Sequence, residues 1–481
     1  MNKAIRKTWI ASACVFVLLL ASLTYIQFFE AKNLEQNVWN SRGMYEIYGS
    51  QRGAIVVDGK EIASSVPSND GYDYQRIYSS PQQYAALTGY FSSIYGTTGI
   101  ESAMNEELSG TSDRQFYDRL AQMFNGGSAQ GATVELTINS QLQELAYNLL
   151  SGHKGSIVAL NPRTGEVLAM VSTPSYDPND LSAHNDEAVL AKYQELNADT
   201  EHPLYNRAIA GNTYSPGSTF KIIDAVAALE SGKYNKDSVI PNPQSYPLPG
   251  TDASLPNYVN GQCSSRTEAS IEWALAQSCN TPFAQIAVDL GYNTLADTAK
   301  NFGYGDANLT IPLAVSESVF PADMQASQLA QAAVGQYDVR TTPLQVAMTS
   351  AAIANKGVQM KPNLIRSVKS HNLNSLYEFS AEELRRSTSE DIAQQVNDWM
   401  VNGVENGIAS GAAVPGYKVA GKTGTAEIGT TGLNNAWFTG FAPADDPQIA
   451  LAVVYEDVGA TEGAALAAPA AQQIFEAVLN R

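Results

Sequence analysis

Cysteine and histidine are scarce in this chain, which has three Cys and four His among 481 residues. The four histidines are scattered along the sequence: His153, His184, His202 and His371. Zinc, haem and iron–sulfur sites draw their ligands mainly from these two residue types. We therefore expect no metal site and no cofactor.

Positive charge is also in short supply. The chain has 29 Lys and Arg residues against 48 Asp and Glu residues, a formal net charge of −19. Nucleic-acid binding depends on cationic patches that neutralise phosphates, so no nucleic-acid partner is expected. A hydrophobic content of 44% is enough for sizeable cores, and the length exceeds that of one small module.

One long uncharged apolar stretch is present, at residues 9–29, and it follows Lys3, Arg6 and Lys7. Its 21 residues can cross about 30 Å of hydrocarbon as a helix. The positive-inside rule keeps residues 1–8 in the cytoplasm, so the sequence predicts a single-pass membrane protein with all later residues outside. The alternative is a cleaved signal peptide, whose apolar core is normally shorter and which needs a small-residue cleavage site.

Cys263 and Cys279 would lie in an oxidising space if the chain is exported. Cys14 falls inside the apolar stretch, so the exported part has no third cysteine to compete. We expect a disulfide between Cys263 and Cys279. Two buried free thiols are the alternative, because spacing alone does not guarantee a geometry that can be bridged.

Two exported parts are expected after the apolar stretch. Residues 30–131 are polar and Tyr-rich, and they end in a Gly-containing stretch at 125–131 that is typical of a flexible linker. We expect them to form a non-catalytic N-terminal domain, of a pedestal or dimerisation type. Residues 132–481 show a helical pattern, a hairpin, a long helical region, further strands and a last helix; the strands are at 156–160, 167–171, 417–420, 436–441 and 449–455, and the last helix is at 465–479. This order predicts an α+β domain with an antiparallel sheet covered by helices.

Ser218 and Lys221 are the first candidate catalytic pair. Pro216-Gly217 breaks the chain before them, and a run with helical spacing follows. Residues i and i+3 share a helix face, so both side chains would meet in the first turn, where free N–H groups and the helix dipole stabilise an oxyanion. A serine hydroxyl needs a base, and a lysine with a lowered pKa can serve. A capping serine with a surface lysine is the alternative, and Ser151 and Lys154 show the same spacing at the end of a helical pattern.

Ser278-Cys279-Asn280 is the second candidate motif. Thr267 could cap a helix before it, and Thr281-Pro282 is typical of a helix start with Pro at the first position. The motif is therefore expected in a tight joint between two helices. Ser278 could relay a proton and Asn280 could donate to a substrate amide, whereas two ordinary capping residues are the alternative.

Lys422-Thr423-Gly424-Thr425 is the third candidate motif, on a strand after residues 417–420. Lys422 would supply a cation, Thr423 or Thr425 a hydroxyl for a carboxylate, and Gly424 room for a close approach. The N–H of Thr425 could complete an oxyanion hole with that of Ser218. The alternative is a turn at a strand end with a solvated lysine.

The three motifs together, in this order, resemble the signature set of serine β-lactamases and penicillin-binding proteins. Nearly the whole chain resembles class B penicillin-binding proteins, in particular the penicillin-binding protein A subgroup. Arg52-Gly53-Ala54-Ile55 is similar to the family's N-terminal box, residues 159–170 to the hairpin that opens the transpeptidase domain, and residues 436–441 to the strand beside Lys-Thr-Gly.

This resemblance implies a peptidoglycan D,D-transpeptidase of cell-wall synthesis. Ser218 would attack a D-Ala-D-Ala stem peptide and pass the acyl group to an amine of a neighbouring stem, with Lys221 as the acylation base. Ser278, Asn280 and Lys422 would complete the catalytic set, and Ser278 with Lys422 would handle the proton of the leaving group.

The resemblance also implies the ligands and partners. Thr423, Gly424, Thr425 and Trp437 would bind the substrate, with Thr423 and Thr425 holding its terminal carboxylate. Penicillins and other β-lactams would acylate Ser218. The membrane would hold residues 9–29, and a SEDS-type glycosyltransferase would be a partner in the cell-wall machinery.

Two other functions stay open at this point. The first is a hydrolase, either a D,D-carboxypeptidase or a β-lactamase, although a class A β-lactamase needs a Glu after the Ser-x-Asn motif and Glu195 precedes Ser218. The second is a non-catalytic scaffold or a β-lactam sensor. A sensor carries several membrane spans and a cytoplasmic output segment, but here only residues 1–8 precede the apolar stretch.

Overall fold

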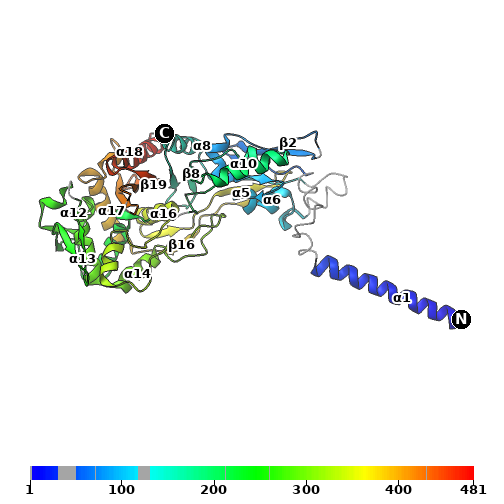
Figure 1. Cartoon of the computed structure of the whole chain (residues 1–481), viewed down its shortest axis with the longest axis horizontal. Helices are drawn as coiled ribbons and strands as arrows, with labels where there is room; N and C mark the ends of the chain where they lie inside the picture. The colour runs from blue at the N-terminus through cyan, green and yellow to red at the C-terminus, as the bar shows by residue number, and fades with distance from the viewer. Residues whose placement is uncertain are drawn as a thin grey trace.

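The computed structural model describes residues 3–30, 50–70, 72–116, 130–211, 213–258, 261–429 and 431–480. Residues 125–129 of the predicted linker lie outside these ranges. The first helix, α1 (Lys3–Thr24), continues as a short π-helix, η1 (Tyr25–Phe29) (Figure 1). The combined stretch has 27 residues with an apolar window of mean hydropathy 2.2, and none of its residues is buried. In the part of the chain that the structure describes, it is the one helix long and apolar enough to cross a membrane.

A six-stranded sheet forms the part of the body that follows, in the order β15-β14-β6-β1-β2-β3. Its strands are β1 (Ile55–Val57), β2 (Lys60–Pro67), β3 (Tyr74–Tyr78), β6 (Thr133–Leu136), β14 (Ile365–Lys369) and β15 (Ser375–Glu378). Beside it lie α4 (Pro81–Thr88), the β4 (Phe91–Ser92)–β5 (Gly96–Thr97) hairpin, α5 (Gly99–Ala103), α6 (Asn105–Ser109) and the 3₁₀ turn η2 (Asp113–Gln115). The predicted division at residue 131 does not separate two sheets, because β6 pairs in parallel with β1 and antiparallel with β14.

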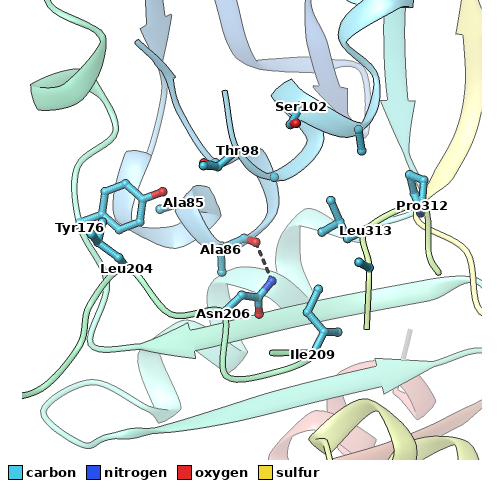
Figure 2. Close-up of a pocket in the computed structure, with 14 residues that line it drawn as sticks. Ala85, Ala86, Thr98, Ser102, Tyr176, Leu204, Asn206, Ile209, Pro312 and Leu313 are labelled. Atoms are coloured by element: carbon cyan, nitrogen blue, oxygen red, sulfur yellow. Dashed lines mark hydrogen bonds between the residues drawn. The ribbon is translucent and has the colours of Figure 1, made fainter. Parts of the chain in front are cut away.

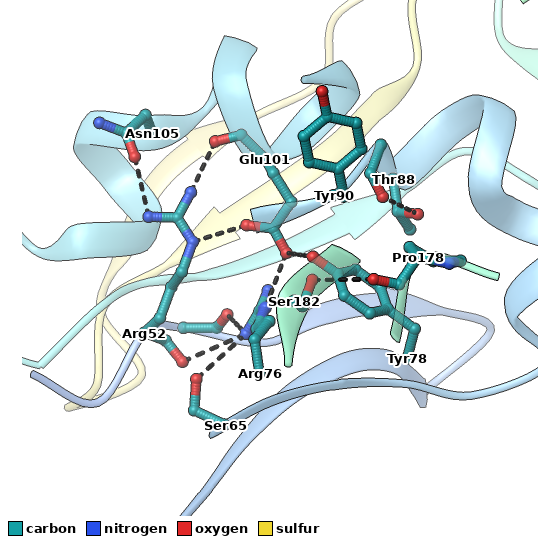
Figure 3. Close-up of polar contacts among 12 residues, drawn as sticks. Arg52, Ser65, Arg76, Tyr78, Thr88, Tyr90, Glu101, Asn105, Pro178 and Ser182 are labelled. Carbon is teal, nitrogen blue, oxygen red and sulfur yellow. Dashed lines mark hydrogen bonds and ion pairs between the residues drawn. The ribbon is translucent and has the colours of Figure 1, made fainter. Parts of the chain in front are cut away.

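A buried ion-pair network stabilises this first sheet and its helices (Figure 3). Glu101 of α5 is fully buried between two guanidinium groups, with Arg52 Nε at 2.5 Å and Arg76 Nε at 2.7 Å. Tyr78 also donates its hydroxyl to Glu101, at 3.1 Å. Burial alone would raise the pKa of Glu101, but the charges of Arg76 and Arg52 outweigh it and lower that pKa. The carboxylate therefore stays ionised in the interior and joins β3 to the segment before β1.

The second sheet is antiparallel, in the order β17-β18-β19-β7-β8. Its strands are β7 (Gly155–Leu160), β8 (Val167–Thr173), β17 (Ala420–Glu427), β18 (Asn434–Ala442) and β19 (Ile449–Val458). The predicted hairpin and the last two predicted strands are confirmed. The strand predicted at 417–420 is wrong in its start, because a turn at Pro415-Gly416, with Gly416 at φ +84°, keeps residues 417–419 out of the ladder. The Lys-Thr-Gly motif itself lies on a strand, as predicted, inside β17.

Helices cover both faces of this sheet (Figure 1). On β19, Leu451 and Val453 pack in one core with α8 (Ser140–Leu149) and α18 (Ala460–Leu479), whereas Ala452 and Val454 pack in the other with α16 (Pro343–Ala354). Alternation of side chains along a strand accounts for this division. The predicted terminal helix is confirmed and starts earlier than expected, with Pro469 inside it. The α+β fold with an antiparallel sheet covered by helices is also confirmed.

The remaining elements carry most of the candidate motifs. The helices are α9 (Asn179–Ser182), α10 (Asp186–Ala198), α11 (Lys221–Glu230), α12 (Ile271–Ala276), α13 (Asn280–Leu290), α14 (Tyr292–Asn301), α15 (Ala326–Ala332) and α17 (Glu390–Glu405). Short strand pairs are β9 (Val239–Pro241) with β12 (Glu268–Ser270), β10 (Ser245–Pro247) with β11 (Ser254–Pro256), and β13 (Val358–Met360) with β16 (Glu383–Arg386). Three short 3₁₀ turns are η3 (Gly217–Phe220), η4 (Gln262–Ser265) and η5 (Ser410–Ala412).

A cavity of about 440 Å³ lies where α4 and α5 meet the segment that leads to Ser218 (Figure 2). Ala85 and Thr98 line it from the first part, and Leu204, Asn206 and Ile209 from the second. Asn206 donates its Nδ2 to the carbonyl of Ala86, at 2.7 Å. This bond fastens the chain before the nucleophile motif to the N-terminal part.

Candidate active site

Ser218 lies in the 3₁₀ turn η3, directly before α11. Its side chain is partly exposed, whereas Lys221, the first residue of α11, is fully buried. The amine of Lys221 lies 3.0 Å from Ser218 Oγ. The two side chains are thus in contact, as expected, with the serine in the 3₁₀ turn and the lysine at the helix start.

The amine of Lys221 has two further hydrogen-bond partners, and both are oxygens that can only accept hydrogen bonds. Nζ donates to the carbonyl of Ser278 at 2.8 Å and to Oδ1 of Asn280 at 2.7 Å. A neutral amine has two N–H groups and one lone pair, so it can satisfy both oxygens and still accept the hydroxyl proton of Ser218. The three neighbours therefore fit Lys221 as a free base.

Electrostatics favour the same protonation state. Burial, and then the nearby charge of Lys422, lower the pKa of Lys221 well below its usual value, while Asp224 acts in the opposite direction. An uncharged lysine near neutral pH can take the proton of a serine hydroxyl in the manner of a general base.

Ser278 and Asn280 lie in the joint between α12 and α13, as predicted. Ser278 has φ +60°, a left-handed conformation that is uncommon for a residue with a side chain and that marks a sharp reversal. The predicted caps are wrong: Ser270, not Thr267, caps α12 by accepting from Trp273 N, and α13 begins at Asn280, so Pro282 is its third residue. The chain between residues 267 and 270 is held as strand β12 instead, which delays the helix.

The amide of Asn280 is engaged at both ends. Oδ1 accepts from Lys221, and Nδ2 donates to the carbonyl of Pro256 at 2.9 Å. This amide therefore helps to hold Lys221, and Nδ2 keeps a second N–H that the predicted contact with a substrate amide would use.

Lys422 extends from β17 to the same joint. Nζ donates to Ser278 Oγ at 2.7 Å and to the carbonyl of Thr423 at 2.8 Å, and the side chain is buried. Burial lowers the pKa of Lys422 to about 7. Near neutral pH this amine can thus both hold and release a proton beside the Ser278 hydroxyl.

Glycines bring η3 against β17. A Cβ added to Gly217, whose φ is +54°, would lie 2.8 Å from the carbonyl oxygen of Thr425, and one added to Gly424 would lie 3.1 Å from that of Pro216. Gly335 packs as closely on the other side, because a Cβ there would lie 1.9 Å from the carbonyl oxygen of Gly217. Small residues at these three positions therefore let the nucleophile turn lie next to the Lys-Thr-Gly strand.

The expected substrate-binding residues differ in their surroundings. Thr425 is exposed, and Gly424 is buried against η3. The hydroxyl of Thr423 is buried and has no hydrogen-bond partner among the described residues. Trp437 is 1% exposed, donates Nε1 to the carbonyl of Ser215 at 3.2 Å and packs edge-on against Tyr214. A buried indole cannot contact a substrate, so the prediction for Trp437 is corrected to a role in holding the residues before Ser218.

A disulfide joins Cys263 and Cys279, the residue between Ser278 and Asn280.

Ser151 and Lys154, which have the same spacing as Ser218 and Lys221, form no such site. Lys154 instead forms ion pairs with Asp457 at 2.6 Å and with Glu201 and Glu456. Sequence patterns did not indicate two further residues: Asp224, which is fully buried near Lys221, and Asn257, which contacts the start of α13. Neither belongs to a motif, and Asn257 is distant from Asn280 along the chain.

Comparisons with known proteins agree with this geometry. A family model for the penicillin binding protein transpeptidase domain matches residues 155–476, and one for the penicillin binding protein A dimerisation domain matches residues 52–134. Peptidoglycan D,D-transpeptidase PbpA of Mycolicibacterium smegmatis is 39% identical over 491 residues, which cover 100% of this chain and 99% of that protein. PbpA of Mycobacterium tuberculosis is 37% identical over 491 residues and also covers 100% of this chain and 99% of its own length.

Solved structures give the same result. The crystal structure of PBPA from M. tuberculosis matches with a TM-score of 0.86 at 37% identity and covers 90% of this chain and 100% of that one. Its penicillin G acyl-enzyme complex matches with a TM-score of 0.85 at 37% identity and covers 89% of this chain and 100% of that one. This chain therefore belongs to the penicillin-binding proteins and combines a transpeptidase domain with a dimerisation domain of the penicillin-binding protein A type.

Proposed function

We propose that this protein is a peptidoglycan D,D-transpeptidase that works through an acyl-enzyme on Ser218. The observation that carries the proposal is the contact of the Lys221 amine with Ser218 Oγ, while two acceptor-only oxygens take its N–H groups. The names of the relatives and the acyl-enzyme complexes of M. tuberculosis PBPA support both the reaction and its covalent inhibition by β-lactams.

In the acylation step, Ser218 Oγ attacks the carbonyl carbon of the penultimate D-Ala while its proton passes to Lys221 Nζ. The backbone N–H groups of Ser218 and Thr425 would hold the oxyanion, since the glycine contacts keep these two segments together. The bond to the terminal D-Ala then breaks. Ser278 donates a proton to the leaving amine, and Lys422 returns one to Ser278 through their 2.7 Å hydrogen bond.

The terminal carboxylate of the substrate would lie beside Thr425, whose side chain is exposed. The charged form of Lys422 adds electrostatic attraction, and the unpartnered hydroxyl of Thr423 is a second donor if the strand adjusts by a small amount. β-Lactams carry a carboxylate next to their reactive amide, so the same groups would orient them.

In the second half of the reaction, an amine of a neighbouring stem peptide attacks the ester carbonyl. The attacking amine loses a proton through Ser278 to Lys422, along the same 2.7 Å hydrogen bond. Lys221 returns its proton to Ser218 Oγ as the ester bond breaks, which restores both lysines, frees the enzyme and closes a cross-link. Of the two exported parts, residues 30–131 would form the non-catalytic domain, of a pedestal or dimerisation type, and residues 132–481 would catalyse the transpeptidation.

We infer a single-pass location in the cell membrane. Residues 9–29 would cross it, Lys3, Arg6 and Lys7 would hold residues 1–8 in the cytoplasm, and the catalytic domain would be extracytoplasmic. A SEDS-type glycosyltransferase would supply the glycan strands that this transpeptidase cross-links.

Labelling with a fluorescent penicillin tests the proposal. Full-length protein in detergent should become labelled, and Ser218→Ala should lose all labelling. Ser151→Ala is the control, because Ser151 has the same spacing to Lys154 as Ser218 has to Lys221, and this variant should become labelled to the wild-type extent. Equal labelling of wild type and Ser218→Ala would overturn the proposal.

A second measurement separates transfer to an amine from transfer to water. With stem peptides as donor and acceptor, a transpeptidase forms a cross-linked dimer and releases one D-Ala per link. Release of D-Ala without dimer would favour a carboxypeptidase, and rapid turnover of nitrocefin would favour a β-lactamase. Full complementation of a deletion strain by Ser218→Ala would favour a scaffold.

A further inference from the structure

The start of α13 is capped from a distant part of the chain. Cys279, at the N-cap position, makes no side-chain cap, which leaves the first N–H groups of α13 in need of acceptors. Asn257 provides one: its Oδ1 accepts from the backbone N–H of Asn280 at 2.7 Å and from that of Thr281 at 3.1 Å. A cap normally comes from the residue that precedes the helix, so this arrangement ties two separate segments together.

The other end of the Asn257 amide is fixed as firmly. Nδ2 donates towards three oxygens: Oδ1 of Asn242 at 2.8 Å, the carbonyl of Pro243 at 3.0 Å and the hydroxyl Oγ1 of Thr281 at 3.0 Å. Because the oxygen faces two N–H groups and the nitrogen faces three acceptors, the neighbours allow only one orientation of the amide. Asn257, Asn242 and Thr281 are 4%, 2% and 0% exposed, so these bonds form away from solvent.

Asn242 extends the network to the disulfide loop. Its Nδ2 donates to the carbonyls of Cys263, at 2.7 Å, and Arg266, at 2.9 Å. A buried network in which each amide has partners at both ends is rigid, and it leaves a costly unpaired group when one member is removed. The network therefore specifies one position for the start of α13.

The connection to the chemistry is Asn280. Its main-chain N–H bonds to Asn257, its Nδ2 bonds to the carbonyl of Pro256, and its Oδ1 accepts from the Lys221 amine at 2.7 Å. Two consecutive residues, Pro256 and Asn257, thus hold Asn280 by its side chain and its backbone. Any displacement of Asn280 moves one of the two oxygens that orient Lys221 towards Ser218.

We propose that Asn257 is a positioning residue for acylation, which acts through Asn280 to aim the Lys221 amine at Ser218 Oγ. The proposal rests on the proposed function, in which Lys221 is the base. Asn257 is buried among these partners, so it does not contact the substrate. It should therefore affect the rate of the chemical step and leave non-covalent binding unchanged.

The test is acylation of full-length protein in detergent by a chromogenic or fluorescent penicillin over a range of concentrations. This gives the first-order acylation constant separately from the dissociation constant of the non-covalent complex. Asn257→Ala should lower the first-order constant by about tenfold to a hundredfold, since small misplacements of reacting groups have effects of that size. The dissociation constant should change by less than about twofold, because no substrate contact is lost.

Two further variants keep the result interpretable. Asn257→Asp retains an acceptor for both N–H groups but cannot donate to Asn242 or Pro243, so its rate should fall less than that of Asn257→Ala. Asn397→Ala is the matched control: Asn397 is also a buried asparagine, 6% exposed, and it donates to the carbonyl of Ala444 at 2.8 Å, a residue outside the three motifs. It should lower the melting temperature and leave the acylation constant unchanged.

The proposal is overturned if either Asn257 variant melts cooperatively and acylates at the wild-type rate. It is also overturned if the dissociation constant rises while the first-order constant stays the same, or if Asn397→Ala slows acylation as much as Asn257→Ala does. Loss of labelling in Ser218→Ala together with a normal rate in Asn257→Ala would remove the positioning role and leave the proposed function standing.

Discussion

Lys422 Nζ and Ser278 Oγ lie 2.7 Å apart, although 144 residues separate them along the chain. Lys221 reaches the same joint from a third segment and donates to the carbonyl of Ser278. Two buried lysines thus meet around one serine, and their charges oppose each other. The site depends on this repulsion, because it helps to keep Lys221 uncharged.

Removing the charge of Lys422 should change the pH dependence of acylation. The pKa of Lys221 is lowered by burial and then by Lys422, so Lys422→Met should raise the pKa of Lys221. A base must be unprotonated to act, and the acid limb of the rate profile should consequently move to higher pH, on top of a lower maximum rate. Time courses of penicillin labelling between pH 5 and 9 measure this shift.

Lys418→Met, at an exposed lysine nearby, is the control and should leave the pH profile unchanged. An acid limb that does not move in Lys422→Met would contradict the coupling between the two lysines.

Asp224→Asn should stabilise the protein. Asp224 is fully buried, and neither carboxylate oxygen has a hydrogen-bond partner among the described residues. Burial raises its pKa well above the usual value, while Lys221 acts in the opposite direction. The folded state therefore keeps a proton that the unfolded state releases as pH rises above about 4, so this group makes the protein less stable with rising pH.

Thermal melts at pH 5 and pH 8 give the measurement. The neutral amide avoids the cost of ionisation, so Asp224→Asn should gain on the order of 1–3 kcal/mol over wild type at pH 8 and less at pH 5. Asp237→Asn, at a side chain 76% exposed, should change neither value. A gain that is the same at both pH values would show that Asp224 is destabilising for a reason other than its titration.

Trp437→Phe distinguishes the corrected role of Trp437 from the one that the sequence suggested. The variant keeps an aromatic ring but loses the donor to the carbonyl of Ser215. The residues before Ser218 should become less well held, so the first-order acylation constant should fall by about tenfold with little change in the dissociation constant. Trp399→Phe, at another buried tryptophan, is the control. An increased dissociation constant with an unchanged rate would restore the substrate-binding role.

The sequence predicted those parts of the site in which residues close together in one motif are also close together in space. Ser218 lies in the turn that leads directly into α11 at Lys221, and Ser278 and Asn280 share a joint between helices, so local spacing was sufficient. It failed for Trp437, because residues on both faces of β18 are buried, so alternation does not show which side chains reach a substrate. It missed Asn257, whose side-chain partners come from residues 242 and 243 and from the start of α13, all of them separated from it along the chain. The strand order of the first sheet was also not predictable: β14 and β15 come more than 200 residues after β6, and no local pattern shows that they complete this sheet.

The disulfide is the last feature that a direct measurement can test. Cys279 is flanked by Ser278 and Asn280, so the bridge to Cys263 braces the joint that holds both side chains. With a sequence separation of 16 between the two cysteines, the bridge should contribute about 3 kcal/mol by limiting the unfolded chain. Replacing both cysteines with serine should lower the melting temperature and slow acylation, whereas Cys14→Ser should do neither. Thiol counting on denatured, unreduced full-length protein should find one reactive thiol, at Cys14, and three reactive thiols would show that the bridge does not form in the purified protein.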